Sequence, residues 1–372
     1  MALWGLTAFG IFVGYRPPKR HTAYDHLSLA QKIRALDLPG VSLFAAGLTM
    51  FLVGLGLGWG LFSWTNVRVL VTLILGLVTL IAFAIYEWLG IKTGMAHHDL
   101  FRGGWRVGGT FSIFLALIFI EGVMLFSYVI FYPVLTTSLF EEDTFLLAGR
   151  EQPFWVGGGL STLLWGYWAV RVKSIRVPLF TGFLVFTAGI GGFTTIQPDD
   201  STRACIFAGL AGIGFGAPLV LIIAGIQLAT PHALIATGTA LAIASRAVSS
   251  SVFTAIYSAT LTERLEPKII SYVSKAAVSH GLPVTSVKGF VEAIVAKDSE
   301  ALAQLAGVTP AIIQAGIVAV KQASADSIRI VFIIAAPFGV LACLLCFLLA
   351  DQSNAMTYRV DAPIEDLHAR RK

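Results

Sequence analysis

The stretch GTFSIFLALIFIEGVMLFSYVIFYP, residues 109–133, is largely apolar and carries a single charged residue, Glu121. At 1.5 Å of rise per residue, a helix of this length crosses the roughly 30 Å hydrocarbon core of a bilayer. The whole chain shares this character: of its 372 residues 56% are hydrophobic and 13% charged, and the mean hydropathy is +0.80. Ordinary soluble domains have about 25% charged residues. The sequence therefore predicts an integral membrane protein.

Further apolar runs of similar length follow each other along the chain. The eight runs lie near residues 39–63, 68–88, 109–135, 154–172, 177–196, 205–228, 233–261 and 327–350. None shows the alternation typical of a strand, and a helix satisfies its own backbone polar groups in lipid. We therefore predict an all-α fold, a polytopic transmembrane helical bundle in contact with the lipid bilayer.

The orientation of the chain follows from its lysines and arginines. With residues 16–38 as a cytoplasmic loop, fifteen basic residues of the short loops and the tail fall inside and three fall outside. This satisfies the positive-inside rule and makes 351–372 a cytoplasmic tail. Residues 1–15 are apolar, but their charges follow the apolar run, which is unlike a signal peptide. We expect a partial transmembrane helix whose beginning is missing.

One outer segment, residues 262–326, is long. Its amphipathic patterns IISYVSKAAVSH and VKGFVEAIVAK predict helices, and Thr309-Pro310 has the residues of a helix cap and first turn. We expect a small helical cap on the outer face, in which no chemical groups cluster. A role in gating or substrate capture is the alternative.

Two charges lie near the middle of predicted spans, Glu121 and Arg246. Charges at such positions are costly and usually functional. Glu121 shares a helix face with Phe114, Met124 and Tyr128, an apolar and aromatic wall that we expect to be accessible to water. A carboxylate there suits a proton carrier, with the arginine controlling its ionisation. The alternatives are a static ion pair that fixes helix packing, or two unrelated positions.

The predicted pathway for substrate and protons contains those residues together with Gln227 of the span 205–228. No metal and no cofactor is predicted, because His97 and His98 fall in a solvated loop and Cys343 and Cys346 in a span. No nucleophile, base and metal set converges within the spans, so we expect no enzyme. The pI near 9.1 reflects the inner loops and favours an anionic membrane leaflet over nucleic acid.

Longer stretches resemble a known family. LDLPGVSLFAAGLTMFLVGLGLGWGLFSWTN (36–66) and VLVTLILGLVTLIAFAIYEW (69–88) resemble the central two-helix insertion of fungal major facilitator superfamily transporters with 14 helices. GFGAPLVLIIAGIQLATPHALIATGTALAIASRAV (214–248) and VFTAIYSATL (252–261) extend the resemblance. It is strongest to the trichothecene efflux pump group, with siderophore transporters as relatives.

The resemblance implies a chain that holds the end of a sixth helix, the two inserted helices within 39–88 and the C-terminal six-helix half, 109–350. In such folds two halves rock around a site at the membrane midplane. The implied function is proton-coupled efflux of a bulky, apolar small molecule such as a toxin or drug, in the plasma membrane or the vacuolar membrane. The alternatives are a siderophore-iron/proton transporter and a truncated membrane partner that transports nothing. After Arg246, similar transporters show a pair of glycines, whereas this chain has Ser249-Ser250-Ser251.

The missing N-terminal half is itself an expected partner, and we do not expect this chain to transport without it.

Overall fold

The computed structural model describes residues 2–15, 28, 37–58, 62–90, 97–102, 104, 108–231 and 234–356, and the regular structure among them is helical throughout. This confirms the predicted all-α fold class. The α-helices are α1 (Ala2–Gly14), α3 (Leu38–Gly58), α4 (Val67–Ile85), α5 (Thr110–Leu139), α6 (Thr144–Val172), α7 (Arg176–Gly192), α8 (Ser201–Ala229), α9 (Ile235–Ser279), α10 (Val284–Ala296), α11 (Ser299–Gln304) and α12 (Pro310–Leu348). Short helical turns are η1 (Tyr86–Gly90), η2 (His98–Leu100) and η4 (Phe193–Thr195).

Seven of the described helices are long and apolar enough to cross a membrane, namely α3, α4 with η1, α5, α7 with η4, α8, α9 and α12. The eighth predicted span, 154–172, lies in α6, which is 29 residues long but is not among the seven. Glycines, tryptophans and a proline make α6 less apolar than its neighbours, and it packs along α8. The chain is therefore a multi-pass membrane protein, as its composition predicts.

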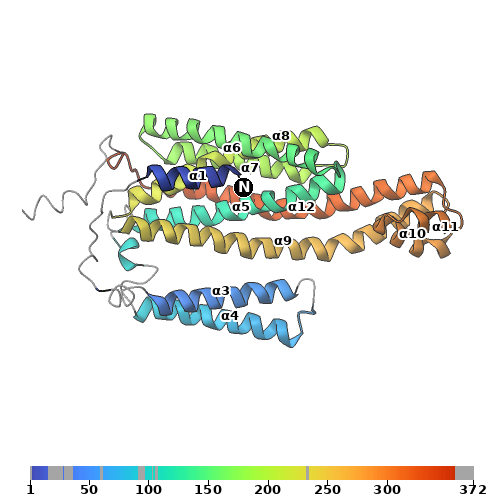
Figure 1. Ribbon diagram of the computed structural model, residues 1–372, viewed down its shortest axis with the longest axis horizontal. Coiled ribbons are helices and arrows are strands. Elements are labelled where there is room, and N and C mark those ends of the chain that lie inside the picture. Colours follow the sequence, from blue (N-terminus) through green and yellow to red (C-terminus); the bar gives the residue numbers. More distant parts are fainter. Residues whose placement is uncertain are drawn as a thin grey trace, which may run out of the picture. The chain divides into compact units, whose positions relative to one another are not determined.

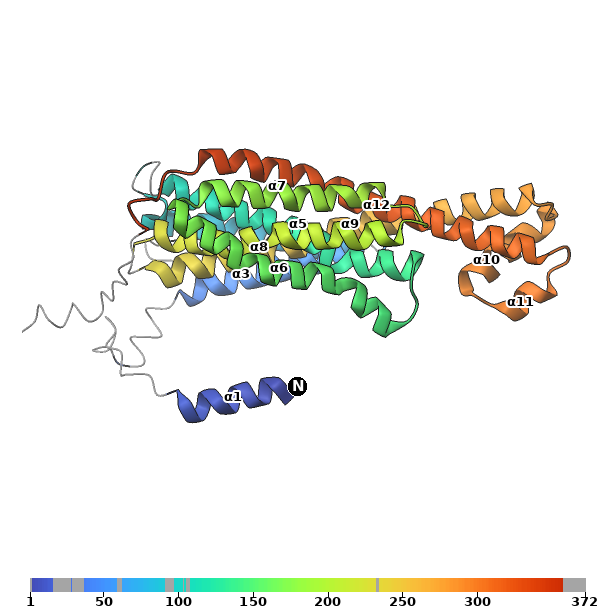
Figure 2. The same cartoon turned by 90° about the horizontal axis from the view of Figure 1, so that it is seen from above.

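Helices α5 to α9 and α12 form one bundle (Figures 1 and 2). Helices α6 and α7 pack against α8, while α5, α9 and α12 pack against one another. A stack of aromatic rings joins the two groups: the Tyr128 ring of α5 lies 4.0 Å from that of Phe154 in α6, centroid to centroid. Aromatic pairs of this kind add about 0.5–1.5 kcal/mol to the area that they bury.

Helices α3 and α4 form a closely packed hairpin. A Cβ atom on Gly76 of α4 would lie 2.4 Å from the backbone nitrogen of Phe51, and one on Gly54 would lie 2.8 Å from the Thr72 hydroxyl. Glycine is thus required where the two backbones approach, a common device between membrane helices. The glycine-rich run that begins at Gly54 serves helix packing here.

The two ends of the chain are described only in part. Helix α1 is apolar and 13 residues long, shorter than a membrane span, within the expected partial helix 1–15. Most of the expected cytoplasmic loop 16–38 and residues 357–372 of the expected tail lie outside the described residues.

The segment 262–326, expected as a long loop with a cap, consists mainly of helix. Helix α9 continues to Ser279 and α12 begins at Pro310, so both extend beyond the predicted spans. Polar residues end the apolar run after Leu261 but not the helix, because a helix in water needs only one apolar face. The side chain of Thr309 accepts a hydrogen bond from the Ile312 amide at 3.4 Å, as the expected helix start requires.

We call α10, α11 and the adjoining ends of α9 and α12 the cap (Figure 1). It has an apolar core of its own, in which the side chains of Val273, Phe290 and Ile312 are buried. The cap is linked to the bundle by an ion pair between Lys297, the residue after α10, and Glu142 in the connection between α5 and α6. The cap is therefore a small folded unit at one end of the bundle.

Candidate functional site

The two charges predicted near the membrane midplane lie in direct contact. Nε of Arg246 in α9 donates a hydrogen bond to Oε2 of Glu121 in α5, at 2.6 Å. The Glu121 side chain has no exposed surface, and that of Arg246 is 23% exposed. Charge-assisted hydrogen bonds are about twice as strong as neutral ones. The contact therefore ties α5 to α9 through one buried ion pair.

A glycine allows this contact to form. Gly122 follows the carboxylate, and a Cβ atom there would lie 2.1 Å from the Ser249 hydroxyl and 3.0 Å from the Arg246 carbonyl oxygen. Ser249 in turn donates to that carbonyl at 2.9 Å. Gly122 on α5 therefore leaves space for the Ser249 side chain of α9.

Two further hydrogen bonds connect α9 to α5 on either side of the pair. The Ser245 hydroxyl donates to the Leu115 carbonyl at 3.3 Å, and the Tyr257 hydroxyl donates to the Val123 carbonyl at 3.1 Å. Both acceptors are backbone groups of α5. Side chains of α9 thus fix its position along α5 at three levels.

Two polar atoms of the pair have no hydrogen-bond partner among the described residues. These buried atoms are Oε1 of Glu121 and Nη2 of Arg246. A buried group left unpaired costs about 1–3 kcal/mol, more when charged. Oε1 of Glu121 could therefore bind a proton, and Nη2 of Arg246 could donate a hydrogen bond to a further polar group.

The other residues of the predicted pathway do not converge on the carboxylate. Phe114 packs against Gly225 of α8, Met124 approaches Gly339 of α12, and Tyr128 stacks on Phe154 of α6. All three side chains are buried, so the expected water-accessible wall is instead the interior of the bundle. Positions seven residues apart on a helix are about 10 Å apart along its axis, so they meet different neighbours.

Gln227 lies near the end of α8, two positions before Ala229, and its side chain is exposed. Its place in the pathway for substrate and protons stays a prediction.

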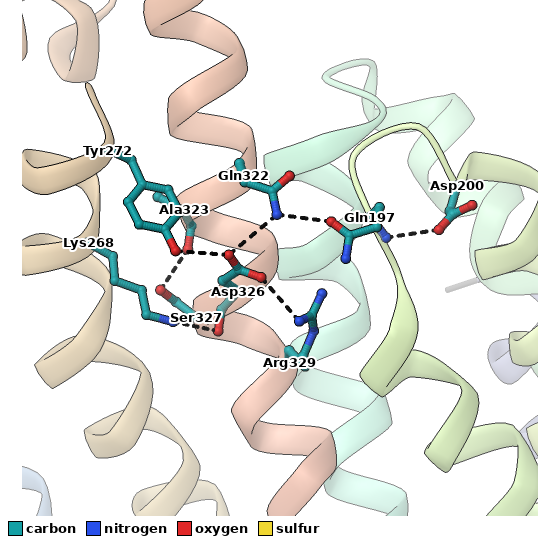
Figure 3. A network of polar contacts seen from close by, with 9 residues as sticks. All are labelled: Gln197, Asp200, Lys268, Tyr272, Gln322, Ala323, Asp326, Ser327 and Arg329. Atoms are coloured by element: carbon teal, nitrogen blue, oxygen red, sulfur yellow. Dashed lines mark hydrogen bonds and ion pairs between the residues drawn. The ribbon is translucent and has the colours of Figure 1, made fainter. Parts of the chain in front are cut away.

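The sequence analysis did not predict a polar cluster that lies at the cap end of the bundle. Its centre is Asp326 of α12, whose Oδ2 accepts hydrogen bonds from the Tyr272 hydroxyl at 3.1 Å and from Gln322 at 3.3 Å (Figure 3). Nη1 of Arg329 lies 3.3 Å from its Oδ1. The Lys268 ammonium group donates to the Asp326 carbonyl at 2.9 Å.

This cap-end cluster also reaches the connection between α7 and α8. Nε2 of Gln322 donates to Oε1 of Gln197 at 2.9 Å (Figure 3). The expectation that no chemical groups cluster in 262–326 was therefore wrong. The spacing of Gln322, Asp326 and Arg329, four and three residues apart, places them on one helix face and was the available signal.

The arrangement of acidic, histidine and cysteine side chains does not build a metal site within the described ranges, where no three of them come together. What the bundle offers chemically is a buried carboxylate with one cationic partner. Such a group can hold or release a proton as its neighbours move.

Comparison with known proteins gives a consistent result. The family model described as fungal trichothecene efflux pump (TRI12) matches residues 5–372. The chain is 25% identical over 367 residues to the MFS-type transporter prx5 of Penicillium rubens, covering 95% of this chain and 64% of that protein. It is 26% identical over 328 residues to the trichothecene efflux pump TRI12 of Fusarium sporotrichioides, covering 85% and 53%.

Among solved structures, the chain is similar to a bacterial homologue of the human lysosomal transporter Spinster in an inward-facing and unoccupied conformation. The TM-score is 0.45 and the identity 16%, over 84% of this chain and 66% of that one. The coverages above show that the chain spans between half and two thirds of the length of the two fungal relatives.

Proposed function

Because the chain belongs to the fungal trichothecene efflux pump family, we propose that it takes part in the proton-coupled export of a bulky, apolar small molecule. The observation that supports the coupling is the buried contact between Glu121 and Arg246. An ion pair inside a membrane bundle is costly unless it is used or well compensated. The proposed location is the plasma membrane, with the vacuolar membrane as the alternative.

In the proposed mechanism, Arg246 holds Glu121 ionised in one conformation. If the contacts between α9 and α5 open in a second conformation, the guanidinium separates from the carboxylate, and Glu121 then takes up a proton because the ionised form is unfavourable in the low-dielectric interior. Return of α9 releases the proton. Export would be coupled to this cycle if the same movement of α9 opens and closes the path of the substrate.

A second candidate, a membrane partner that transports nothing, is favoured by one observation. Glu121 has no exposed surface even though the chain covers only part of its relatives' length. A group that exchanges protons must meet water or another carrier at some stage. In this second function the pair would only fix the packing of α5 on α9.

The test is an export assay in sealed vesicles with a controlled pH gradient and a fluorescent apolar compound. Two proteins are compared: the chain itself, and a fusion to the part of the Penicillium rubens relative that the chain does not match. We expect proton-driven export by the fusion and its loss in Glu121→Gln. Unchanged pH dependence in Glu121→Leu/Arg246→Leu, with normal membrane levels, would establish the structural function instead.

A further inference from the structure

The cap carries a groove that the export proposal does not use. It lies between the cap segment of α9 and α10 and has a volume of about 1070 Å³. Pockets for small molecules are typically about 300–1,000 Å³ and mostly apolar. Its lining includes the apolar side chains of Leu261, Leu265, Ile270, Val284, Val291 and Val295.

The groove shares Val291 with the core of the cap but extends beyond that core. Helix α10 turns Phe290 and Ile294 into the core of the cap, where both are buried. Its Val284 and Val295 line the groove and are 79% and 52% exposed. A surface helix needs one apolar face for folding, so a second exposed one typically marks a binding surface.

The groove is continuous with the membrane-crossing part of α9. It begins at Leu261, where the predicted span 233–261 ends, and extends to Ala296 at the end of α10. A molecule that leaves the bundle along α9 would therefore meet an apolar surface before it meets water.

The charges around the groove restrict what it can hold. Glu266 and Glu292 face it together with Lys288, and none of the three makes an ion pair within the part of the chain that the structure describes. Two carboxylates against one ammonium group give a negative local field. That field favours a neutral or cationic molecule over an anionic one.

We propose that the groove is a binding site for an apolar small molecule that is neutral or cationic, occupied on the path of the exported compound. That the bound molecule is the exported compound rests on the proposed function. The existence of the site depends only on the shape, lining and charge of the groove.

The test measures binding of three fluorescent probes to the full chain in lipid nanodiscs, with empty nanodiscs as the blank: neutral N-phenyl-1-naphthylamine, cationic rhodamine 6G and anionic 8-anilinonaphthalene-1-sulfonate. We expect saturable binding of the first two probes and weaker binding of the anionic one. Val284→Asp and Val295→Asp should each weaken binding of the neutral probe about tenfold, because a carboxylate replaces apolar contact area.

Matched variants separate the groove from general effects. Ile317→Asp places the same charge on an exposed position of α12 outside the groove and should leave binding unchanged. Glu266→Gln/Glu292→Gln should weaken binding of the cationic probe several-fold and leave the neutral probe unaffected. Because Val284 is largely exposed, its variant should keep the wild-type thermal midpoint.

Equal binding by the wild type, Val284→Asp and Val295→Asp would overturn the site, as would the absence of saturable binding to the wild type. Preference for the anionic probe would overturn the assigned ligand class. No transport is measured here, so this result is independent of export by the Glu121→Gln protein, and each proposal can fail alone.

Discussion

The two charged clusters of the molecule differ in how many partners each carboxylate has. Glu121 is enclosed in the bundle and has one partner, Arg246. Asp326 at the cap end has three side-chain partners, and its own side chain is 20% exposed. Removing one partner therefore leaves a bare charge in the first cluster but only a thinner network in the second. A carboxylate with one partner can change its ionisation when that contact opens. A carboxylate with several partners keeps the helices together when one contact is lost.

The largest effect is expected from breaking the buried pair. Arg246→Ala leaves the carboxylate of Glu121 without its cation, and we expect a loss of stability of about 3–5 kcal/mol, seen as a large fall in the thermal midpoint in detergent. Glu121→Leu/Arg246→Leu should recover most of that loss, because no charge remains. A double variant as unstable as Arg246→Ala would show that the bundle depends on the pair itself.

The next effect tests the approach of the two helices without changing a charge. Gly122→Ala places a methyl group against the Ser249 hydroxyl and the Arg246 carbonyl, and we expect a loss of about 1–3 kcal/mol from overpacking. Gly159→Ala in α6, where a Cβ atom would meet nothing within 4 Å, is the matched control. Adding Ser249→Gly to Gly122→Ala should restore part of the midpoint. If the double variant recovers none of the thermal midpoint, the strain of Gly122→Ala does not come from Ser249.

A smaller effect is expected at the cap end. Asp326→Asn keeps the shape of the side chain and removes its charge, and we expect about 1–2 kcal/mol, less than for Arg246→Ala, since solvent and remaining donors compensate. Asp199→Asn, at an exposed neighbouring position, should change nothing measurable. A loss at Asp326 as large as that at Arg246 would contradict the distinction between the two clusters.

The smallest effect concerns pH. The hydrogen bond and charge of Lys297 hold the pKa of Glu142 below its ordinary value of 4.5. Because the pKa of Glu142 is lowered in the folded state, its ion pair with Lys297 stabilises the attachment of the cap fully at pH values above 4.5. This stabilisation is lost as the pH falls through the lowered pKa. In a carbon-13 NMR titration, Lys297→Gln should raise the pKa of Glu142 towards 4.5. Lys321→Gln, a weaker and purely coulombic neighbour, should raise it less.

The sequence predicted the helices and the charged pair for the same physical reason. Apolar runs and isolated charges such as Glu121 and Arg246 are conspicuous in a chain that lies in lipid. Outside the membrane the signal is weaker, because a helix such as α9 can continue with only one apolar face. That is why the pattern at 269–280 predicted a separate helix within the long outer segment, whereas in the structure it continues the preceding span as one helix, α9.

The neighbours of the pair were harder to predict than the pair. Helix spacing places Phe114, Met124 and Tyr128 near Glu121 on α5, but which helix faces each of them depends on the packing of the bundle. The role of Gly122 was equally hidden, since it follows from the distance between two backbones.

Helix α9 runs from the bundle into the cap as one helix of 45 residues. At 1.5 Å per residue it is a rod about 68 Å long, so a tilt of about 5° about its middle displaces each end by about 3 Å. Under the proposed mechanism, such a rod would transmit a change at Arg246 to the cap. Pro267, inside α9 where the cap begins, interrupts the backbone hydrogen bonds there and is the natural place for the rod to bend.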